Sequence, residues 1–492
     1  MIRINNVSFR YANADEFAIR DINITVHKGE FLVLLGESGC GKTTITRLIN
    51  RLVPEFYEGD LSGKVLINGK ETTNLSIQNL AGIVGSVFQD PRSQFFATDT
   101  TAEIAFSCEN VGLPREELCK RIEKAANDLQ IKKLLERSIF ELSSGEKQAI
   151  AIASVYALTP QIFVLDEPSA NLDTAATKHL MEILNILKNN GYTVVVSEHR
   201  IHYLKDIADR AILMKNGKIV KEITKEGFRT LTNKETKNMG LRSVDLTKIK
   251  PNTHRKKNGI EQLKLQDISF NYGQDNKVLN NVSFSADKGN VIGIIGSNGA
   301  GKSTLLEIIC GLQKERSGRI LFNDNLAKPK NRIKNTFLVM QNSDYQLFTE
   351  SVAKEICLES DKKKSLDGRG LTLLKRMDLD KVLERHPASL SGGQKQRLCI
   401  AVACMKDADI VCFDEPTSGL DYIRMKNVSD LLYELSEAGK TLLVTTHDYE
   451  FLMLTCTHIC FLKEGSVAEF FEVNEKSASK IYNILFQEET VK

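Results

Sequence analysis

The sequence has no run of about 18 or more apolar residues, so we expect no helix that spans a membrane. It also has no Cys-x-x-Cys pair, and its ten cysteines are scattered without a metal-ligand spacing. This pattern argues against both a zinc site and a disulfide framework. The N-terminus alternates apolar and polar residues and lacks the apolar stretch of a signal peptide. We therefore expect the chain to stay in the cytosol unless a partner holds it at a membrane.

A strong excess of one charge is also missing. The 492 residues include 66 Lys and Arg against 63 Asp and Glu, a formal net charge of +3, which is too small to favour nucleic acid as a partner. Residues 225–260 are strongly basic, and the rest of the chain is slightly acidic. This stretch contains Pro251 and Gly259 and no sustained apolar period, so we interpret it as a solvated linker. Contact of its Arg255–Lys257 cluster with anionic lipid headgroups or RNA is the alternative.

The chain repeats itself. The segment Phe31–Thr44 returns as Val291–Thr304, 260 residues later, and Phe163–Pro168 returns as Val411–Pro416, 248 residues later. Internal repeats of this kind indicate duplicated units of structure.

The repeat predicts two domains, residues 1–228 and 261–492, joined by a basic linker over residues 229–260. Within each copy, short β-rich runs alternate with helix-like stretches. This alternation is typical of βαβ units, so we predict an α/β fold with a mainly parallel sheet in each copy.

Each copy contains a candidate phosphate-binding loop between a β-rich run and a helix-like run. Two segments match Gly-x4-Gly-Lys-Ser/Thr: Gly36-x4-Gly41-Lys42-Thr43 and Gly296-x4-Gly301-Lys302-Ser303. The glycines let backbone N–H groups curve around phosphates, and the following helix N-terminus favours negative charge. The two lysines would reach the β- and γ-phosphates, and the hydroxyls of Thr43 and Ser303 would hold Mg²⁺.

Four further kinds of residue recur with matching spacing. They are Asp166 and Asp414, Glu167 and Glu415, His199 and His447, and Ser143 and Ser391. The aspartates end apolar strands and are placed to bind Mg²⁺ directly or through water. The glutamates beside them can polarise an attacking water. The histidines lie 33 residues after the aspartates, and each follows a β-rich run. The serines lie 23 residues before the aspartates, and each begins a Gly-containing motif. Because the spacing is the same in both copies, we predict a function for all of these residues.

With these motifs, the chain resembles a tandem ATP-binding cassette (ABC) ATPase over nearly its whole length. The resemblance implies two P-loop NTPase domains, each with a mainly parallel core sheet, an antiparallel β part and a helical subdomain that carries the signature motif. It implies ATP and Mg²⁺ as cofactors. It also implies that two ATP molecules are sandwiched head to tail, each between the phosphate loop of one cassette and the signature of the other.

The resemblance assigns roles residue by residue. The catalytic residues are expected to be Glu167, His199, Glu415 and His447. The metal-binding residues are expected to be Thr43, Gln89, Asp166, Ser303, Gln341 and Asp414. In the first copy, ATP is expected to contact Tyr11, Gly36, Ser38, Gly39, Gly41, Lys42, Thr43, Thr44, Gln89, Ser143 and Gly145. In the second copy, it is expected to contact Tyr272, Gly296, Asn298, Gly299, Gly301, Lys302, Ser303, Thr304, Gln341, Ser391, Gly392, Gly393 and Gln394.

The first signature departs from the family pattern. It is Ser-Ser-Gly-Glu, where the family usually has Ser-Gly-Gly-Gln. Ser144 adds a Cβ at a position of close approach, and Glu146 adds a negative charge near phosphate. We therefore expect the site built on Lys302 to be slower or weaker. Both sites are still expected to hydrolyse ATP, because both copies keep the Glu and the His.

The segments that begin at Gln89 and Gln341 indicate which class of ABC ATPase the chain resembles. Gln89–Phe96 and Gln341–Phe348 share the pattern Gln-x4-Gln-[Phe/Leu]-Phe. The second glutamine and the aromatic residues are not needed for the chemistry at ATP. Together with the downstream sequence of Thr101–Phe106 and Glu109–Glu117, these segments resemble those of the ATPases of energy-coupling factor importers. Such importers take up vitamins and transition-metal ions.

That resemblance implies two membrane partners, an integral coupling subunit and a membrane-embedded substrate-binding subunit, and no nucleic acid. The chain would then lie at the cytoplasmic face of the cell membrane. We expect Phe95, Phe96 and Phe348 near the groove that receives the coupling helices of the membrane subunit.

Two other kinds of tandem-cassette protein remain as alternatives. A soluble ribosome-associated translation factor also has two intact sites, but it usually carries a longer charged helical arm between the cassettes. The fused ATPase of a sugar importer has a similar length but often a degraded second phosphate loop, whereas Gly296–Thr304 is intact. A cassette ATPase of DNA repair is disfavoured because the chain has no zinc insertion and no long coiled coil.

Overall fold

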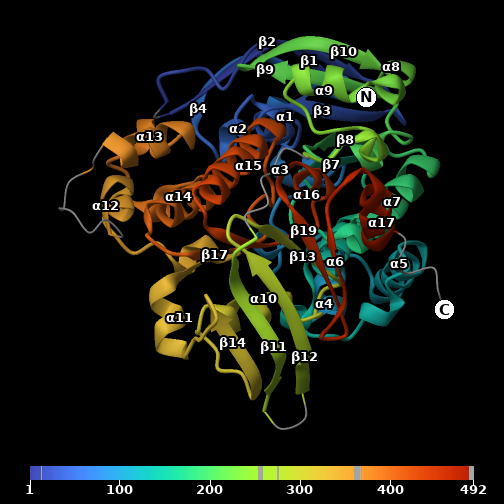
Figure 1. Ribbon diagram of the computed structural model, residues 1–492. Helices are drawn as coiled ribbons and strands as arrows, with labels where there is room; N and C mark the ends of the chain where they lie inside the picture. The colour runs from blue at the N-terminus through green and yellow to red at the C-terminus, as the bar shows by residue number, and fades with distance from the viewer. Residues whose placement is uncertain (13, 253–258, 274–275, 359–365, 367, 487–492) are drawn as a thin grey trace. The chain divides into compact units, whose positions relative to one another are not determined.

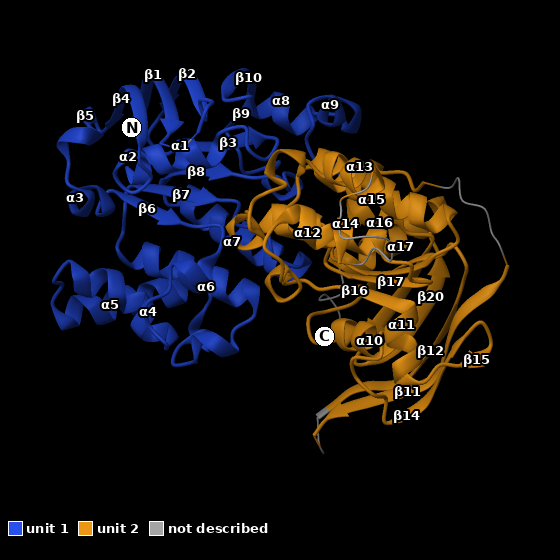
Figure 2. Ribbon diagram, turned by 90° about the vertical axis from the view of Figure 1, so that its left-hand side faces the viewer, with its two compact units in different colours: residues 1–245 blue, residues 246–492 orange. Residues whose placement is uncertain are grey.

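The computed structural model describes residues 1–12, 14–252, 259–273, 276–358, 366 and 368–486. The chain divides into two compact units, Met1–Asp245 and Leu246–Lys492, which Figure 2 colours separately. Among the described residues, no helix combines the length and the apolar character needed to cross a bilayer.

Unit 1 contains an antiparallel sheet and a mainly parallel sheet (Figure 1). The antiparallel sheet has the order β2-β1-β4-β5, with strands Ile19–Val26, Ile2–Tyr11, Gly59–Ile67 and Lys70–Glu71. The second sheet has the order β10-β9-β3-β8-β7-β6, with strands Lys218–Thr224, Arg210–Lys215, Phe31–Gly36, Thr193–Ser197, Ile162–Asp166 and Val84–Val87. Its pairs are parallel except β9 with β10.

Unit 2 repeats this plan. Its antiparallel sheet has the order β12-β11-β14-β15, with strands Asn276–Asp287, Glu261–Tyr272, Ser317–Phe322 and Asn325–Leu326. Its larger sheet has the order β16-β17-β18-β13-β19-β20, with strands Thr336–Val339, Ile410–Asp414, Thr441–Thr445, Val291–Ile295, His458–Lys463 and Ser466–Glu472. Read from the opposite edge, this is the strand order of unit 1. The predicted α/β architecture is therefore confirmed.

Helices complete both units. In unit 1 they are α1 Lys42–Ile49, α2 Leu52–Glu55, α3 Ile77–Ala81, α4 Thr100–Asn110, α5 Arg115–Asp128, α6 Ser144–Ala157, α7 Thr174–Asn189, α8 Lys225–Thr230 and α9 Asn233–Asn238. In unit 2 they are α10 Lys302–Ile309, α11 Pro329–Asn335, α12 Val352–Cys357, α13 Gly368–Arg376, α14 Gly392–Met405, α15 Tyr422–Glu437, α16 Tyr449–Thr455 and α17 Glu475–Phe486.

The central strand of each parallel sheet is buried on both faces. In β3, Phe31, Val33 and Leu35 belong to one hydrophobic cluster, which also contains residues of α6 and α7. Leu32 and Leu34 belong to a second cluster, which contains residues of α1, β1 and β2. Because successive side chains of a strand point to opposite faces, such a strand must be apolar throughout. This explains the unbroken apolar runs that end in the two phosphate-binding loops.

The described part of the expected linker is packed against the two units. Arg242 and Ser243 are only 3% and 1% exposed, and Leu241 and Val244 belong to the core of unit 1. Leu246 and Ile249 belong to the core of unit 2. The open connector expected over residues 229–260 is therefore much shorter, because a few widely spaced apolar residues anchor a mostly basic segment. The Arg255–Lys257 cluster lies outside the described residues.

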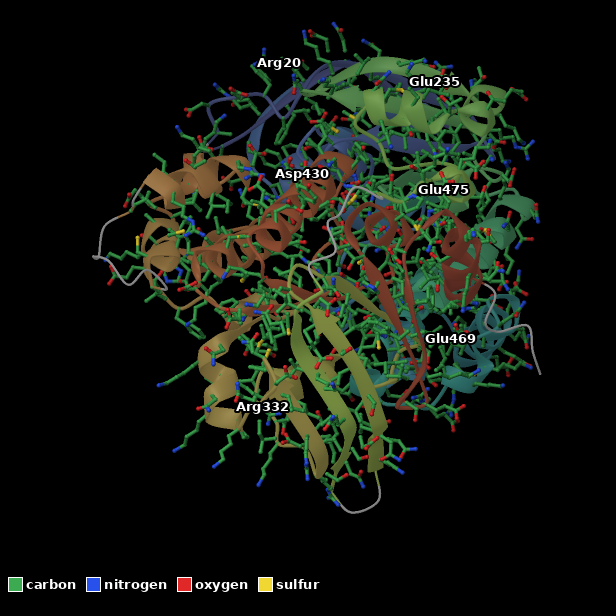
Figure 3. The ribbon with its side chains drawn as sticks, viewed as in Figure 1. Arg20, Glu235, Arg332, Asp430, Glu469 and Glu475 are labelled. Atoms are coloured by element: carbon green, nitrogen blue, oxygen red, sulfur yellow. The ribbon has the colours of Figure 1, made fainter. Side chains whose placement is uncertain are left out.

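One buried charge distinguishes unit 2 from unit 1. Arg332 of α11, labelled in Figure 3, is fully buried, and its Nη2 donates to Glu315 Oε2 at 2.6 Å. Its Nε and Nη1 atoms have no hydrogen-bond partner among the described residues. The residue four positions before the next strand in unit 1 is Leu80, which is also buried.

Candidate active site

The two phosphate-binding loops connect β3 to α1 and β13 to α10. Gly41 and Gly301 cap these helices with left-handed φ angles of 105° and 94°. A Cβ on Gly41 would lie 2.6 Å from Ile19 Cγ2, and one on Gly301 would lie 2.6 Å from Leu279 Cδ2. Glycine is therefore required at both positions for two reasons, backbone conformation and space.

The loop lysines are buried and turn back across their loops. Lys42 Nζ donates to the carbonyl oxygens of Gly36 at 2.9 Å and Glu37 at 3.0 Å. Lys302 Nζ donates to the carbonyl oxygens of Gly296 at 2.8 Å and Ser297 at 3.0 Å. The ammonium groups are thus held at the centres of the loops, where backbone N–H groups and the helix N-terminus favour an anion.

The strand-end aspartates are held by hydroxyl groups. Thr43 Oγ1 donates to Asp166 Oδ1 at 3.2 Å, and the Ser197 hydroxyl donates to the same oxygen. In unit 2 the Thr445 hydroxyl donates to Asp414 Oδ1. Burial is the main cause that raises the pKa of Asp166, and the Ser197 hydrogen bond opposes it. Sequence reasoning missed Ser197 and Thr445, although both end strands at matching positions.

The glutamate of unit 1 lies at the centre of a polar cluster. Glu167 Oε2 accepts from Gln89 Nε2 at 2.8 Å, and Glu167 Oε1 lies 2.9 Å from His199 Nε2. Ser38 Oγ lies 3.3 Å from the same imidazole nitrogen. The structure therefore brings together residues from the phosphate-binding loop, the glutamine loop and two strand ends. A carboxylate held in this way can accept a proton from water.

Both glutamates sit in strained backbone. Glu167 and Glu415 have φ angles of 45° and 51°, a region that non-glycine residues seldom adopt. In unit 2, His447 Nε2 lies 3.5 Å from Glu415 Oε1. The backbone N–H of each glutamate donates to the neighbouring strand, to Ser197 O at 2.9 Å and to Thr445 O at 3.1 Å. Strain of this kind persists where the surroundings fix the backbone, which is common at functional sites.

The donor set of unit 1 fits Mg²⁺. A cavity of about 340 Å³ is lined by Thr43, Gln89 and Asp166, among other residues. Hydroxyl, carboxylate and amide oxygens are ligands that Mg²⁺ accepts, and water and phosphate oxygens usually complete its octahedron. These residues would hold the cation jointly with the phosphates of a nucleotide, which the cation would partly neutralise.

Comparison with known proteins agrees with this geometry. The ABC transporter family matches residues 19–170 and 279–418, more than half of the chain. The chain belongs to the ABC transporter ATPase family. A relative in Treponema denticola, named "Putative ABC transporter ATP-binding protein", is 45% identical over 95% of this chain and 96% of its own length. The chain is thus a fused tandem ABC ATPase.

Two further similarities are informative. The Bacillus subtilis protein named "Putative HMP/thiamine import ATP-binding protein YkoD" is 31% identical over 96% of this chain and 92% of its own length. A solved archaeal ribosome recycling factor, aABCE1, superposes with a TM-score of 0.66 over 97% of this chain and 92% of its own, at 21% identity. The latter similarity concerns the fold alone.

The tyrosines expected beside adenine point their hydroxyls at the phosphate-loop helices of the two cassettes. Tyr11 Oη lies 3.1 Å from Thr44 Oγ1, and Tyr272 Oη lies 3.4 Å from Thr304 Oγ1. The Tyr272 side chain is the more accessible, with 46% exposed. Whether either ring stacks on adenine stays a prediction.

The signature motifs of the cassettes begin α6 and α14. Ser143 and Glu146 form a reciprocal capping box, as do Ser391 and Gln394. Glu146 also lies 3.1 Å from Arg137 Nη1. Despite partial burial, the hydrogen bonds from Ser143 and the charge of Arg137 lower the pKa of Glu146. The extra acid is therefore used in capping its own helix.

The two central signature positions differ in steric demand. A Cβ on Gly145 would lie 2.4 Å from Ala176 Cβ, so this glycine permits close packing on α7. A Cβ on Gly392, which corresponds to Ser144, would meet nothing within 4 Å, and one on Gly393 would meet only Arg397 Nη1 at 3.7 Å. Ser144 is thus compatible with the fold of its own cassette.

The second glutamine of each Gln-x4-Gln pattern clamps the loop backbone. Gln94 accepts from the Phe88 N–H at 3.2 Å and donates to Ser86 O at 3.1 Å. In the second cassette, Gln346 accepts from the Met340 N–H at 2.8 Å and donates to Leu338 O at 2.5 Å. These contacts fix the start of the loop in both cassettes.

A buried carboxylate clamps the other end of each loop. Glu103 accepts from the N–H groups of Phe96 at 2.9 Å and Ala97 at 2.8 Å. Glu355 accepts from the N–H groups of Phe348 at 3.1 Å and Thr349 at 2.8 Å. Both carboxylates are almost fully buried. Sequence reasoning missed them, although they are separated by 252 residues, as Gln94 and Gln346 are.

The aromatic residues between the clamps are not equivalent. Phe96 and Phe348 are 74% and 77% exposed, and Phe96 stacks on Phe106 at 4.8 Å. Phe95 instead packs against the core of the first cassette. Of the three aromatic residues expected to meet a partner, Phe95 is thus partly interior, because it alternates with Phe96 along the chain.

Proposed function

We propose that the chain hydrolyses ATP at two sites to power a membrane importer of the energy-coupling factor type, which takes up a vitamin or a transition-metal ion. The observation that carries this proposal is the clamped loop, which recurs in both cassettes. It begins at Gln89 or Gln341, at the proposed catalytic cluster, and ends at the largely exposed Phe96 or Phe348. Such a loop couples the state of the ATP site to a surface that offers an apolar anchor.

The chemistry uses the residues of each catalytic cluster. A water attacks the γ-phosphorus, the bond from that phosphorus to the bridging oxygen breaks, and ADP leaves. Glu167 or Glu415 accepts the proton of the attacking water, and His199 or His447 orients that carboxylate. Lys42 or Lys302 stabilises the charge of the phosphates, and bound Mg²⁺ supplies further charge neutralisation.

We further propose that each ATP lies between the phosphate loop of one cassette and the signature of the other. The capped N-termini of α6 and α14 support this role, because a helix N-terminus attracts phosphate. Hydrolysis would then remove the bridge between the cassettes, a change that a partner can read.

The proposed partners are an integral membrane coupling subunit and a membrane-embedded substrate-binding subunit, with the chain at the cytoplasmic face of the membrane. The similarity to a relative named for thiamine import supports the importer class. Coupling helices of the membrane subunit would cover Phe96 and Phe348, since exposed aromatic side chains are preferred anchors in interfaces.

The test is a double variant, Phe96→Asp with Phe348→Asp, expressed in the full chain in cells that hold the membrane partners. Burying a Phe side chain contributes about 1.5–3 kcal/mol, so loss of two anchors should weaken membrane association by at least about 100-fold. ATPase activity of the purified chain should be unchanged, because both side chains are exposed. Phe95 is unsuitable, because its substitution would disturb the core.

Matched controls are Val220→Asp and Leu326→Asp, which change exposed apolar residues on strands of the two cassettes. These variants should sediment with membranes as the parent does. If the double variant sediments with membranes as well as the controls do, the assignment of the loop to a membrane partner is wrong. If the parent sediments with ribosomes instead, the alternative of a translation factor is favoured.

A further inference from the structure

The two ATP sites carry opposite charges at one corresponding position. The residue four positions after the loop hydroxyl is Arg47 in unit 1 and Glu307 in unit 2, separated by the same 260 residues as the loops. Residues four apart on a helix lie on one face. Arg47 therefore shares a face of α1 with Thr43, and Glu307 shares a face of α10 with Ser303.

In unit 1, the arginine lines the cavity of the expected metal ligands. Thr43, Arg47, Gln89 and Asp166 all contribute to the cavity of about 340 Å³. Arg47 Nη1 donates to Tyr11 Oη at 3.4 Å, and its guanidinium lies 3.8 Å from the centre of the Tyr57 ring. A fixed positive charge thus lies beside this site.

In unit 2, the same place holds a second carboxylate. Glu307 is half-buried on α10, and the Tyr272 hydroxyl donates a hydrogen bond to its carboxylate. The helix α10 packs against β17, the strand that ends in Asp414. In both units the tyrosine hydroxyl thus contacts a threonine and the charged residue of the same loop helix, but the sign of that residue is reversed.

We propose that the two sites differ in their need for a divalent cation, so that unit 2 binds ATP only together with Mg²⁺ while unit 1 retains affinity for metal-free ATP. Asp414 and Glu307 both repel the phosphates of metal-free ATP, and Mg²⁺ held by Ser303 and Asp414 would neutralise part of this negative charge. In unit 1, Arg47 neutralises part of the charge of Asp166 and attracts the phosphates directly. The difference follows from Coulomb interactions of fixed charges in a partly buried site.

The experiment measures ATP binding by equilibrium dialysis in the full chain, with one loop silenced at a time. Lys302→Ala leaves the site of unit 1, and Lys42→Ala leaves the site of unit 2. Each variant is titrated with ATP in excess Mg²⁺ and in EDTA. We expect EDTA to weaken binding in unit 2 at least about tenfold more than in unit 1.

Charge exchange identifies the residues responsible. Arg47→Glu in the Lys302→Ala background should make binding depend strongly on Mg²⁺, and Glu307→Arg in the Lys42→Ala background should relieve that dependence. The neutral variants Arg47→Gln and Glu307→Gln should lie between. Retained binding in Mg²⁺ shows that a variant is folded. Equal dependence on Mg²⁺ at the two sites, or no effect of the exchanges, would overturn the proposal. Neither outcome bears on the membrane partner, so this test is independent of the importer proposal.

Discussion

Removal of the Glu103 carboxylate should release the loop that ends at Phe96 without unfolding the first cassette. Glu103 is 2% exposed and accepts from two backbone N–H groups, those of Phe96 and Ala97. A hydrogen bond to a charged group contributes about 1.5–3 kcal/mol, and the low end applies where the freed N–H groups can reach water. Glu103→Ala should therefore cost about 3 kcal/mol of local stability.

Hydrogen exchange followed by mass spectrometry measures this change at the site. Because 1.4 kcal/mol corresponds to a factor of ten, the amides of Phe96 and Ala97 should exchange about 100-fold faster in Glu103→Ala. Glu103→Gln keeps an acceptor oxygen and loses the charge, so its effect should be smaller. Association with the membrane partner that we propose should fall in both variants, although Phe96 is still present.

The matched control is Glu109→Ala, because Glu109 is an exposed acid on the same helix. Its exchange pattern at Phe96 and Ala97 should equal that of the parent. If Glu103→Ala folds normally and these two amides exchange no faster than in the control, the carboxylate does not hold the loop. Phe96 would then not owe its exposed position to the contacts of Glu103.

The remaining predictions concern catalysis and the core. Glu167→Gln and Glu415→Gln should each lower the ATPase rate, because each glutamate is proposed to accept a proton from water. The double variant should lower the rate about 100-fold or more. A single variant with an unchanged rate would show that its site does not hydrolyse ATP. In unit 2, Arg332→Leu combined with Glu315→Gln should leave the unfolding temperature unchanged or raise it, because Leu80 fills the corresponding place in unit 1. Arg332→Ala should lower it by several degrees, and equal losses in the two variants would contradict this account.

Local motifs pointed to residues that the structure brings together, while their roles in catalysis stay predictions. The loops, the strand-end acids and the histidines were all found from spacing, because a phosphate-binding loop needs glycine at fixed positions and a parallel sheet brings strand ends to one edge. The structure joins Gln89, Glu167 and His199 in one cluster, as the motifs suggested. Such features depend on a few residues close in sequence or repeated at a constant offset.

Other features could not be predicted because they depend on which backbone groups lack partners after folding. Gln94 was recognised as unnecessary for chemistry, but its role as a clamp depends on the N–H of Phe88 and the carbonyl of Ser86. The same holds for Glu103, whose burial follows from the packing of α4. The basic segment around Arg242 was interpreted as solvated because its charge is visible in the sequence, whereas the apolar anchors beside it are few and widely spaced.

Two acidic departures from symmetry lie in segments that we expect to meet ATP. Glu146 lies in the first turn of the signature helix α6 of the first cassette, and Glu307 lies on the phosphate-loop helix α10 of the second. Glu146 is paired with Arg137 and bound to its own helix N-terminus, so its charge is largely neutralised locally. Glu307 instead lies on α10, which packs against β17, the strand that ends in another carboxylate, Asp414. We expect the site built on Lys302 to be the weaker one. The main cause should be Glu307 on its loop helix, and not Glu146 in the signature.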